Sequence, residues 1–293
     1  MANLGYIGLG AMGGRMVDRL LTKGHSVIGY NRTKSKAQWL LDKGMTWGAT
    51  PRDVARGADV ILVMVTDSAA LEGIADGPDG LVAGLSAGKT IIDMSTVSPV
   101  VSRETVEKVR ACGADMVDSP VSGSISTLEQ GKLTMMVGGK AETFEKVKPL
   151  LLEIGMKATH VGDNGLALSM KIALNLAITT QMLAFSEGIL LAEKAGIDRK
   201  TAVEVYTNSV LASPLIQYRG PFVLNMPEEA WFDMKMMQKD TTLALELGRR
   251  LGVAMPTTAV ANEMLTAARG LGLEKKDCAA VFNVIAKLSG VQA

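Results

Sequence analysis

The first half of the chain alternates continuous apolar runs with amphipathic stretches. Short apolar runs occupy residues 4–9, 25–30, 59–66, 90–95, 116–118 and 134–137, and helical stretches occupy residues 15–22, 99–112 and 141–154. Continuous apolar runs are typical of parallel strands that are buried on both faces of a sheet. The alternation of strands and helices therefore predicts an α/β fold with a doubly wound sheet of the Rossmann type.

From residue 165 onwards the pattern predicts helices only. The stretch 165–195 lacks proline and is apolar almost all the way round, which predicts one long buried helix, and further helices are expected at 199–209, 234–251, 257–270 and 278–288, with a loop at 214–227. We therefore expect a Rossmann domain over residues 1–163 and an all-α domain over residues 164–293, headed by the long interdomain helix. A membrane span is disfavoured, because the window 166–185 is rich in Ala, Thr, Ser and Asn.

One charge interrupts the long apolar helix. Lys171 is the only charged residue between positions 166 and 185, and Asn175 follows it by four positions. On a helix of about 3.6 residues per turn the two side chains project from the same face and form a donor pair. A lysine among apolar neighbours loses solvation, so it is either a snorkelling side chain at a domain edge or a functional group.

A glycine-rich turn lies between the first predicted strand and the first predicted helix. Its spacing matches the GxGxxG fingerprint of dinucleotide-binding folds, in which glycines let the backbone approach a pyrophosphate at a helix N-terminus. The strand before it and the helix after it supply the context that the motif requires. The predicted cofactor contacts of this turn are Gly8, Leu9, Gly10, Ala11, Met12 and Gly13.

The end of the second predicted strand indicates which dinucleotide is bound. NAD-binding folds usually place an acidic residue there, which would repel a 2′-phosphate. Here Asn31, Arg32 and Thr33 occupy the position, and Lys36 follows. A guanidinium can form a paired contact with a phosphate, so these residues predict NADP(H), with NAD(H) as a weaker alternative. A solvated basic turn is the other interpretation.

Later strand ends add candidate ligand contacts. Ligands collect at the carboxyl ends of strands in doubly wound sheets, so Val65, Thr66 and Thr96 are candidate cofactor contacts. The loop 118–124, DSPVSGS, combines a proline with small hydrogen-bond donors, and such a turn can direct N–H groups and hydroxyls at a carboxylate. An ordinary polar loop would have the same composition.

Composition narrows the class of partner. Lys plus Arg total 31 and Asp plus Glu total 30, which removes the electrostatic case for nucleic acid or an anionic membrane surface. The two cysteines and two histidines show no metal or redox spacing, so we expect no disulfide and no metal site. The N-terminus lacks the pattern of a signal peptide. We therefore expect a cytoplasmic protein that acts on a small molecule.

Five motifs in the same order resemble the β-hydroxyacid dehydrogenase family, which includes 3-hydroxyisobutyrate dehydrogenases, tartronate semialdehyde reductases and glyoxylate/succinic semialdehyde reductases. The motifs are IGLGAMG at 7–13, DMST at 93–96, SPVSG at 119–123, the pair of Lys171 and Asn175, and Lys239 with Asp240. The resemblance covers the whole chain.

The resemblance implies roles for individual residues. Lys171 matches the catalytic general acid and base, Asn175 matches the polar residue beside it, and Ser122 with Gly123 match the loop that holds the substrate carboxylate. Thr96 and Lys239 match cofactor contacts. The substrate site is expected to include Ser122, Gly123, Ser124, Asn175, Phe232 and Asp240.

Several segments are similar to the NADPH-dependent glyoxylate/succinic semialdehyde reductases, namely residues 31–33, Ser124, 184–196 and 238–248. This similarity implies hydride transfer between NADPH and a short carboxylate-bearing aldehyde. A 3-hydroxyisobutyrate or tartronate semialdehyde dehydrogenase is the alternative, because segment 125–130 departs from both patterns. An imine reductase or a non-catalytic NADP-binding scaffold is less favoured, because such relatives usually lack the lysine at position 171.

The length of the predicted helix 165–195 also suggests an assembly. At about 1.5 Å per residue it would span about 45 Å, more apolar surface than its own domain covers. We therefore expect a homodimer or homotetramer in which the helical domain forms the contact, with the substrate pocket around Lys171 between the domains.

Overall fold

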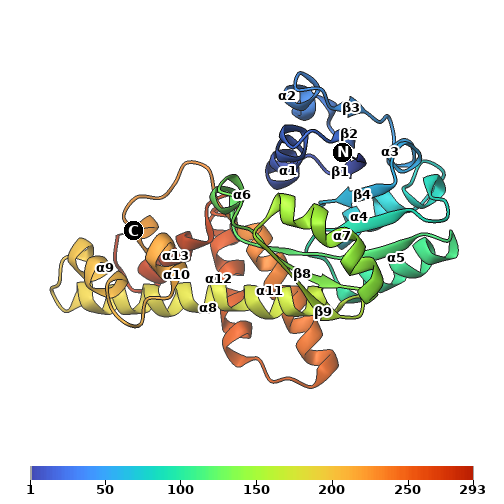
Figure 1. Ribbon diagram of the computed structural model, residues 1–293. Coiled ribbons are helices and arrows are strands. Elements are labelled where there is room, and N and C mark those ends of the chain that lie inside the picture. Colours follow the sequence, from blue (N-terminus) through green and yellow to red (C-terminus); the bar gives the residue numbers. More distant parts are fainter. Residues whose placement is uncertain (1, 293) are drawn as a thin grey trace. The chain divides into compact units, whose positions relative to one another are not determined.

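The computed structural model describes residues 2–292. The chain divides into two compact units, Met1–Lys171 and Ile172–Ala293. The division falls within one continuous helix, α8 (Leu166–Lys194), coloured yellow in Figure 1. Unit 1 contains the sheet and unit 2 is helical, as the hydrophobic pattern predicts.

The sheet of unit 1 has the strand order β3-β2-β1-β4-β5-β6-β8-β7, and β9 also pairs with β8. From β3 to β6 in this order, every pair of neighbouring strands is parallel, which confirms the doubly wound sheet. The order reverses between β1 and β4, the place where open α/β sheets bind ligands. The strands are β1 (Asn3–Ile7), β2 (Ser26–Tyr30), β3 (Thr46–Trp47), β4 (Val60–Val63), β5 (Thr90–Asp93), β6 (Asp115–Asp118), β7 (Val121–Ser122), β8 (Thr134–Gly138) and β9 (Lys157–Gly162).

Alternate side chains of the central strands enter two separate apolar cores. Tyr6 and Leu62 pack with α1 (Ala11–Thr22) and α7 (Ala141–Ile154), whereas Ile7 and Ile61 pack with α3 (Pro51–Gly57) and α5 (Pro99–Ala111). Both faces of these strands are thus covered by helices, which explains why the strand sequences are continuous apolar runs. The helix α4 (Ser68–Ala75) belongs to the second layer through Leu71.

The far edge of the sheet departs from the parallel pattern. β8 is antiparallel to β6 and β7, and β9 returns parallel to β8. The sequence analysis did not separate β7 or β9, because two short runs of mixed polarity carry little strand signal. The short helix α6 (Ile125–Glu129), with Gln130 as its C-cap, follows β7 in the chain and forms the segment 125–130 that departs from the family pattern.

The helix α8 begins and ends within one residue of the prediction. It is not buried throughout, because Leu166, Met170, Leu174 and Leu191 are exposed. Its length and composition alone would let it cross a membrane, and 39% of its most apolar window is buried. Phe185 and other side chains of its second half pack in the core of unit 2, as expected for a core helix.

Unit 2 is built from helices packed on the second half of α8. They are α9 (Arg199–Thr207), α10 (Pro214–Arg219), α11 (Met234–Leu251), α12 (Pro256–Gly270) and α13 (Val281–Leu288), with single 3-10 turns at Gly220–Val223 and Cys278–Ala280. The prediction of a loop over 214–227 is wrong for its first ten residues. Ser213 accepts a hydrogen bond from the Ile216 N–H and Pro214 occupies the first helical position, which together start α10.

Candidate active site

The glycine turn joins β1 to α1 and has the geometry that a pyrophosphate requires. Gly8 has φ of +98°, and a Cβ there would collide with the Met64 carbonyl oxygen. A Cβ on Gly13 would collide with the Gly8 carbonyl oxygen, so α1 packs directly against the turn. These two glycines are therefore required by the fold itself.

Gly10 differs from the other two glycines, because a Cβ there would meet nothing within 4 Å. It is the N-cap of α1, makes no side-chain cap, and is followed by no acidic residue in the first turn. The first N–H groups of α1 and the positive end of its dipole therefore have no side-chain acceptor or acidic neighbour of their own, which suits an anion. Gly8, Leu9, Gly10, Ala11, Met12 and Gly13 fit a dinucleotide pyrophosphate on this observation.

Asn31 ties the glycine turn to the loop after β2. Its Oδ1 accepts a hydrogen bond from the Leu9 N–H at 3.2 Å, and its Nδ2 donates to the Thr33 carbonyl at 3.0 Å. Asn31 is thus engaged with the backbone, while Arg32, Thr33 and Lys36 are exposed beside it. Of the predicted 2′-phosphate contacts, the structure leaves the Arg32 guanidinium and the Lys36 ammonium at the surface.

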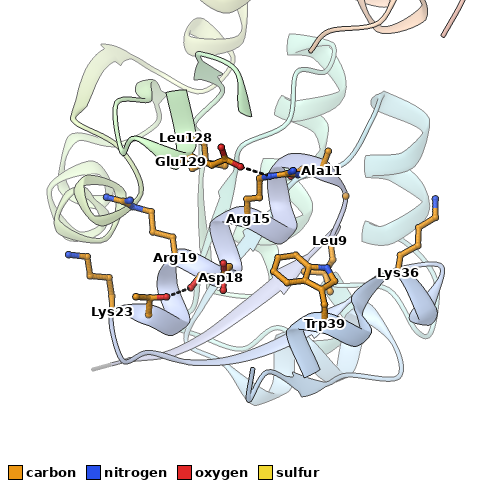
Figure 2. Close-up of a pocket in the computed structure, with 12 residues that line it drawn as sticks. Leu9, Ala11, Arg15, Asp18, Arg19, Lys23, Lys36, Trp39, Leu128 and Glu129 are labelled. Atoms are coloured by element: carbon orange, nitrogen blue, oxygen red, sulfur yellow. Dashed lines mark hydrogen bonds and ion pairs between the residues drawn. The ribbon is translucent and has the colours of Figure 1, made fainter. Parts of the chain in front are cut away.

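A groove of about 840 Å³ opens at the glycine turn and follows α1 (Figure 2). Arg15 lies in it and pairs with Glu129 of α6 at 3.1 Å. Trp39 forms part of the opposite wall, and α1 approaches it closely at Gly14, where a Cβ would lie 3.1 Å from the indole ring. The groove is lined by Leu9, Gly10, Ala11, Arg15, Asp18, Arg19, Thr22, Lys23, Lys36, Trp39, Leu128 and Glu129. Sequence analysis identified only the glycine turn and Lys36 among these.

The predicted contacts at the ends of β4 and β5 lie close together. The Val65 N–H donates to the Ser95 Oγ at 2.9 Å, which joins the loop after β4 to the DMST segment that contains Thr96. The Thr66 hydroxyl lies 3.2 Å from the Asp67 carboxylate. All of these residues follow neighbouring parallel strands at the same edge of the sheet as the glycine turn.

The predicted carboxylate loop follows β6. Ser122 belongs to β7 and pairs with Thr134 of β8, and Gly123 has φ of +135°. Ser124 starts α6: its N–H donates to Thr127 Oγ1 at 3.2 Å, and its Oγ lies 3.0 Å from Ser126 Oγ. Ser124 is thus committed to its own turn, and a Cβ at Gly123 would lie 2.6 Å from Leu133.

Lys171 lies in the second turn of α8, and Asn175 follows one turn later on the same face. Lys171 is half-buried and Asn175 is buried. Asn175 Nδ2 donates to the Asp240 carboxylate of α11, 65 positions away in the sequence. Because a carboxylate only accepts hydrogen bonds, it requires the NH₂ side of the amide to face it. The sequence predicts that Lys171 and Asn175 form a donor pair. In the structure the Asn175 NH₂ is used by Asp240, so Asn175 offers its Oδ1 acceptor on the other side.

Asp240 is held on both sides. Its second oxygen lies 2.9 Å from the Lys239 ammonium, and its side chain is 2% exposed. A buried carboxylate of this kind is stable only with such partners. Lys239 and Asp240 are therefore not a solvated pair on a helix surface, because the Asp240 side chain is buried.

Phe232 sits on a loop that a buried ion pair holds in place. Asp277 is fully buried and pairs with Arg219, with Oδ1 3.0 Å from the Arg219 Nε. Its Oδ2 accepts hydrogen bonds from the N–H groups of Trp231 and Phe232, each at 3.1 Å. Sequence analysis missed Arg219 and Asp277, because they lie 58 positions apart and no local pattern connects them.

Together the doubly wound sheet, the glycine turn and the uncapped helix define a dinucleotide-binding fold. Residues 3–162 match the NAD binding domain of 6-phosphogluconate dehydrogenase, and residues 165–285 match the NAD-binding domain of NADP-dependent 3-hydroxyisobutyrate dehydrogenase. The chain belongs to the β-hydroxyacid dehydrogenase family. It is an NAD(P)-dependent enzyme of the class that acts on CH–OH groups.

Individual relatives span almost the whole chain. Glyoxylate/succinic semialdehyde reductase 2, chloroplastic, from Arabidopsis thaliana is 32% identical over 97% of this chain and 79% of that protein. The 2-(hydroxymethyl)glutarate dehydrogenase of Eubacterium barkeri is 33% identical over 98% of this chain and 96% of its own length. The solved structure of 3-hydroxyisobutyrate dehydrogenase from Salmonella typhimurium is 26% identical and superposes with a TM-score of 0.87, covering 97% of this chain and all of that one.

Proposed function

We propose that the protein is an NADP(H)-dependent reductase of short carboxylate-bearing aldehydes of the succinic semialdehyde or glyoxylate type. The observation that carries this proposal is the polar face of α8, where Lys171 is followed by Asn175 and the buried Asp240 fixes the Asn175 amide. Burying polar side chains in an apolar helix is costly, so Lys171 and Asn175 indicate a function. That function is general acid catalysis, in which Lys171 supplies a proton to the developing alkoxide.

When bound at the glycine turn of residues 8–13, NADPH would supply the hydride that reduces the carbonyl carbon. The protein must then orient the aldehyde and neutralise charge on its oxygen, and Lys171 donates the proton to that oxygen. Ser122 and the N–H groups around Gly123 bind the carboxylate. Because the Asn175 NH₂ is engaged by Asp240, its Oδ1, which accepts hydrogen bonds, suits an ammonium better than a carboxylate. Asn175 therefore serves to orient Lys171 in this mechanism.

The preference for NADP(H) rests on the loop after β2. No acidic side chain stands at Asn31, whose amide is used to hold the Leu9 and Thr33 backbone. Arg32 and Lys36 are exposed beside it and free of the acidic neighbour that would repel a 2′-phosphate. NAD(H) is the weaker cofactor on this proposal.

The test is NADPH oxidation with four aldehydes: succinic semialdehyde, glyoxylate, methylmalonate semialdehyde and tartronate semialdehyde. We expect the highest kcat/KM with one of the first two. The relatives named above are about equally similar and carry different substrate names, so the panel separates the alternatives. Preference for one of the last two would support a 3-hydroxyisobutyrate or tartronate semialdehyde type enzyme, and no turnover with any would contradict the proposal.

A further inference from the structure

The N-terminus of α8 lacks a capping side chain of its own. Gly165 precedes the first helical residue with φ of +87°, and it has no side chain to accept from the first-turn N–H groups. Usually the N-cap side chain accepts a hydrogen bond from the second or third helical N–H. Here the acceptor has to come from another part of the chain.

Asp118, the last residue of β6, supplies that acceptor. Its Oδ1 accepts a hydrogen bond from the Gly165 N–H at 2.8 Å, and its Oδ2 accepts from the Leu168 N–H at 3.3 Å. Leu168 is the third residue of α8, the position that a local cap would serve. The carboxylate of Asp118 therefore caps a helix that begins 48 positions later.

The surroundings of Asp118 are arranged to keep this carboxylate in place. It is fully buried, and Asn164 Nδ2 lies 3.3 Å from its Oδ1 while also donating to the Met116 carbonyl at 2.9 Å. A Cβ on Gly138 of β8 would lie 2.8 Å from the carboxylate, so only glycine fits there. Burial raises the pKa of Asp118 despite these hydrogen bonds. Burying the Asp118 carboxylate costs desolvation free energy, and the hydrogen bonds to the start of α8 are what this burial makes possible.

The position of Asp118 in the chain connects two parts of the proposed site. It immediately precedes the loop that contains Ser122 and Gly123, and it holds the helical turn directly before Lys171. We propose that Asp118 is a positioning residue, which fixes the first turn of α8 and so sets where the Lys171 ammonium lies relative to the carboxylate loop. This inference rests on the proposed function for its kinetic consequence only.

The test replaces Asp118 with asparagine. The variant keeps the shape of the side chain but turns an NH₂ group toward one of the two N–H donors, so one cap is lost. Asp118→Ser is the second variant, in case the asparagine variant does not fold. Asp53→Asn is the matched control in the same unit, because Asp53 accepts a hydrogen bond from the Thr50 N–H at 3.1 Å and so serves the start of α3 instead of α8.

Two readouts decide the matter. Hydrogen exchange of the apo protein should show faster exchange of the Gly165 and Leu168 amides in Asp118→Asn, and no change there in Asp53→Asn. In the reductase assay, kcat should fall about 10- to 100-fold, since a misplacement of about 1 Å can cost about 100-fold. KM for the aldehyde and Kd for NADPH should stay within about twofold.

The double variant with Lys171→Ala separates positioning from general damage. If Asp118 acts through Lys171, Asp118→Asn should not lower the residual turnover of Lys171→Ala any further. An equal fold-loss in both backgrounds would overturn the proposal, as would unchanged amide exchange or an unchanged kcat. A wild-type protein that reduces none of the four aldehydes would overturn the proposed function instead, and the exchange measurement would still decide whether Asp118 anchors α8.

Discussion

Replacing Asp277 with asparagine tests whether the buried ion pair of unit 2 holds the loop that contains Phe232. The substitution conserves volume, so no cavity term enters. It leaves the Arg219 guanidinium, 2% exposed, without its counter-charge and brings an NH₂ group to an oxygen position that accepts from two backbone N–H groups. Breaking a buried pair from one side typically costs about 3–5 kcal/mol, because an uncompensated charge stays buried. We expect a loss of stability in this range.

Urea unfolding followed by circular dichroism measures the change, with the midpoint shifting and the slope unchanged. Asp198→Asn is the matched control: Asp198 is an exposed N-cap of α9, and asparagine caps helices about equally well, so its effect should stay below about 0.5 kcal/mol. KM for the aldehyde should rise in Asp277→Asn if Phe232 lines the pocket. A loss below about 1 kcal/mol would refute the reasoning, since the pair would then be replaceable.

Three further predictions concern single side chains. Lys171→Ala should lower turnover about 100- to 10,000-fold and leave Kd for NADPH unchanged, and retention of most of the wild-type kcat would show that Lys171 is structural. Arg32→Glu should weaken NADPH binding by about 1.5–3 kcal/mol and leave NADH binding much less affected, measured by fluorescence titration; equal wild-type efficiency with both cofactors would contradict the assignment. Burial raises the pKa of the Cys278 thiol to about 12, so iodoacetamide at pH 8 should modify the half-buried Cys112 and spare Cys278 in the native protein.

Much of the fold follows from local signals in the sequence. The bounds of α7 and α11 agree with the predicted ranges 141–154 and 234–251, because each helix carries one apolar stripe and ends at a clear break. Gly13 of the glycine turn is likewise fixed locally, because a Cβ there would collide with the Gly8 carbonyl oxygen of the same turn. Local chemistry determines these elements, so a single sequence reveals them.

The features that the sequence did not reveal depend on pairs far apart in the chain. The orientation of the Asn175 amide depends on Asp240, the start of α8 depends on Asp118, and the loop before Phe232 depends on Asp277. No periodicity connects these residues, because a carboxylate has the same appearance in a sequence whether it is solvated or buried. The three carboxylates share one role, which is to fix backbone or amide groups next to predicted site residues.

Homo-oligomerisation through α8 is the last prediction. Leu166, Met170 and Leu174 are 47%, 43% and 43% exposed and are spaced four residues apart, so they form one apolar stripe on the helix. A stripe of this kind on a monomer would favour aggregation, whereas a second copy would bury it. Light scattering at micromolar concentration should give a multiple of the 30.9 kDa chain mass. Leu166→Glu with Leu174→Glu should dissociate the assembly, and the control Leu152→Glu, at an exposed position on α7, should not. The mass of one chain for the wild-type protein with full activity would rule the assembly out.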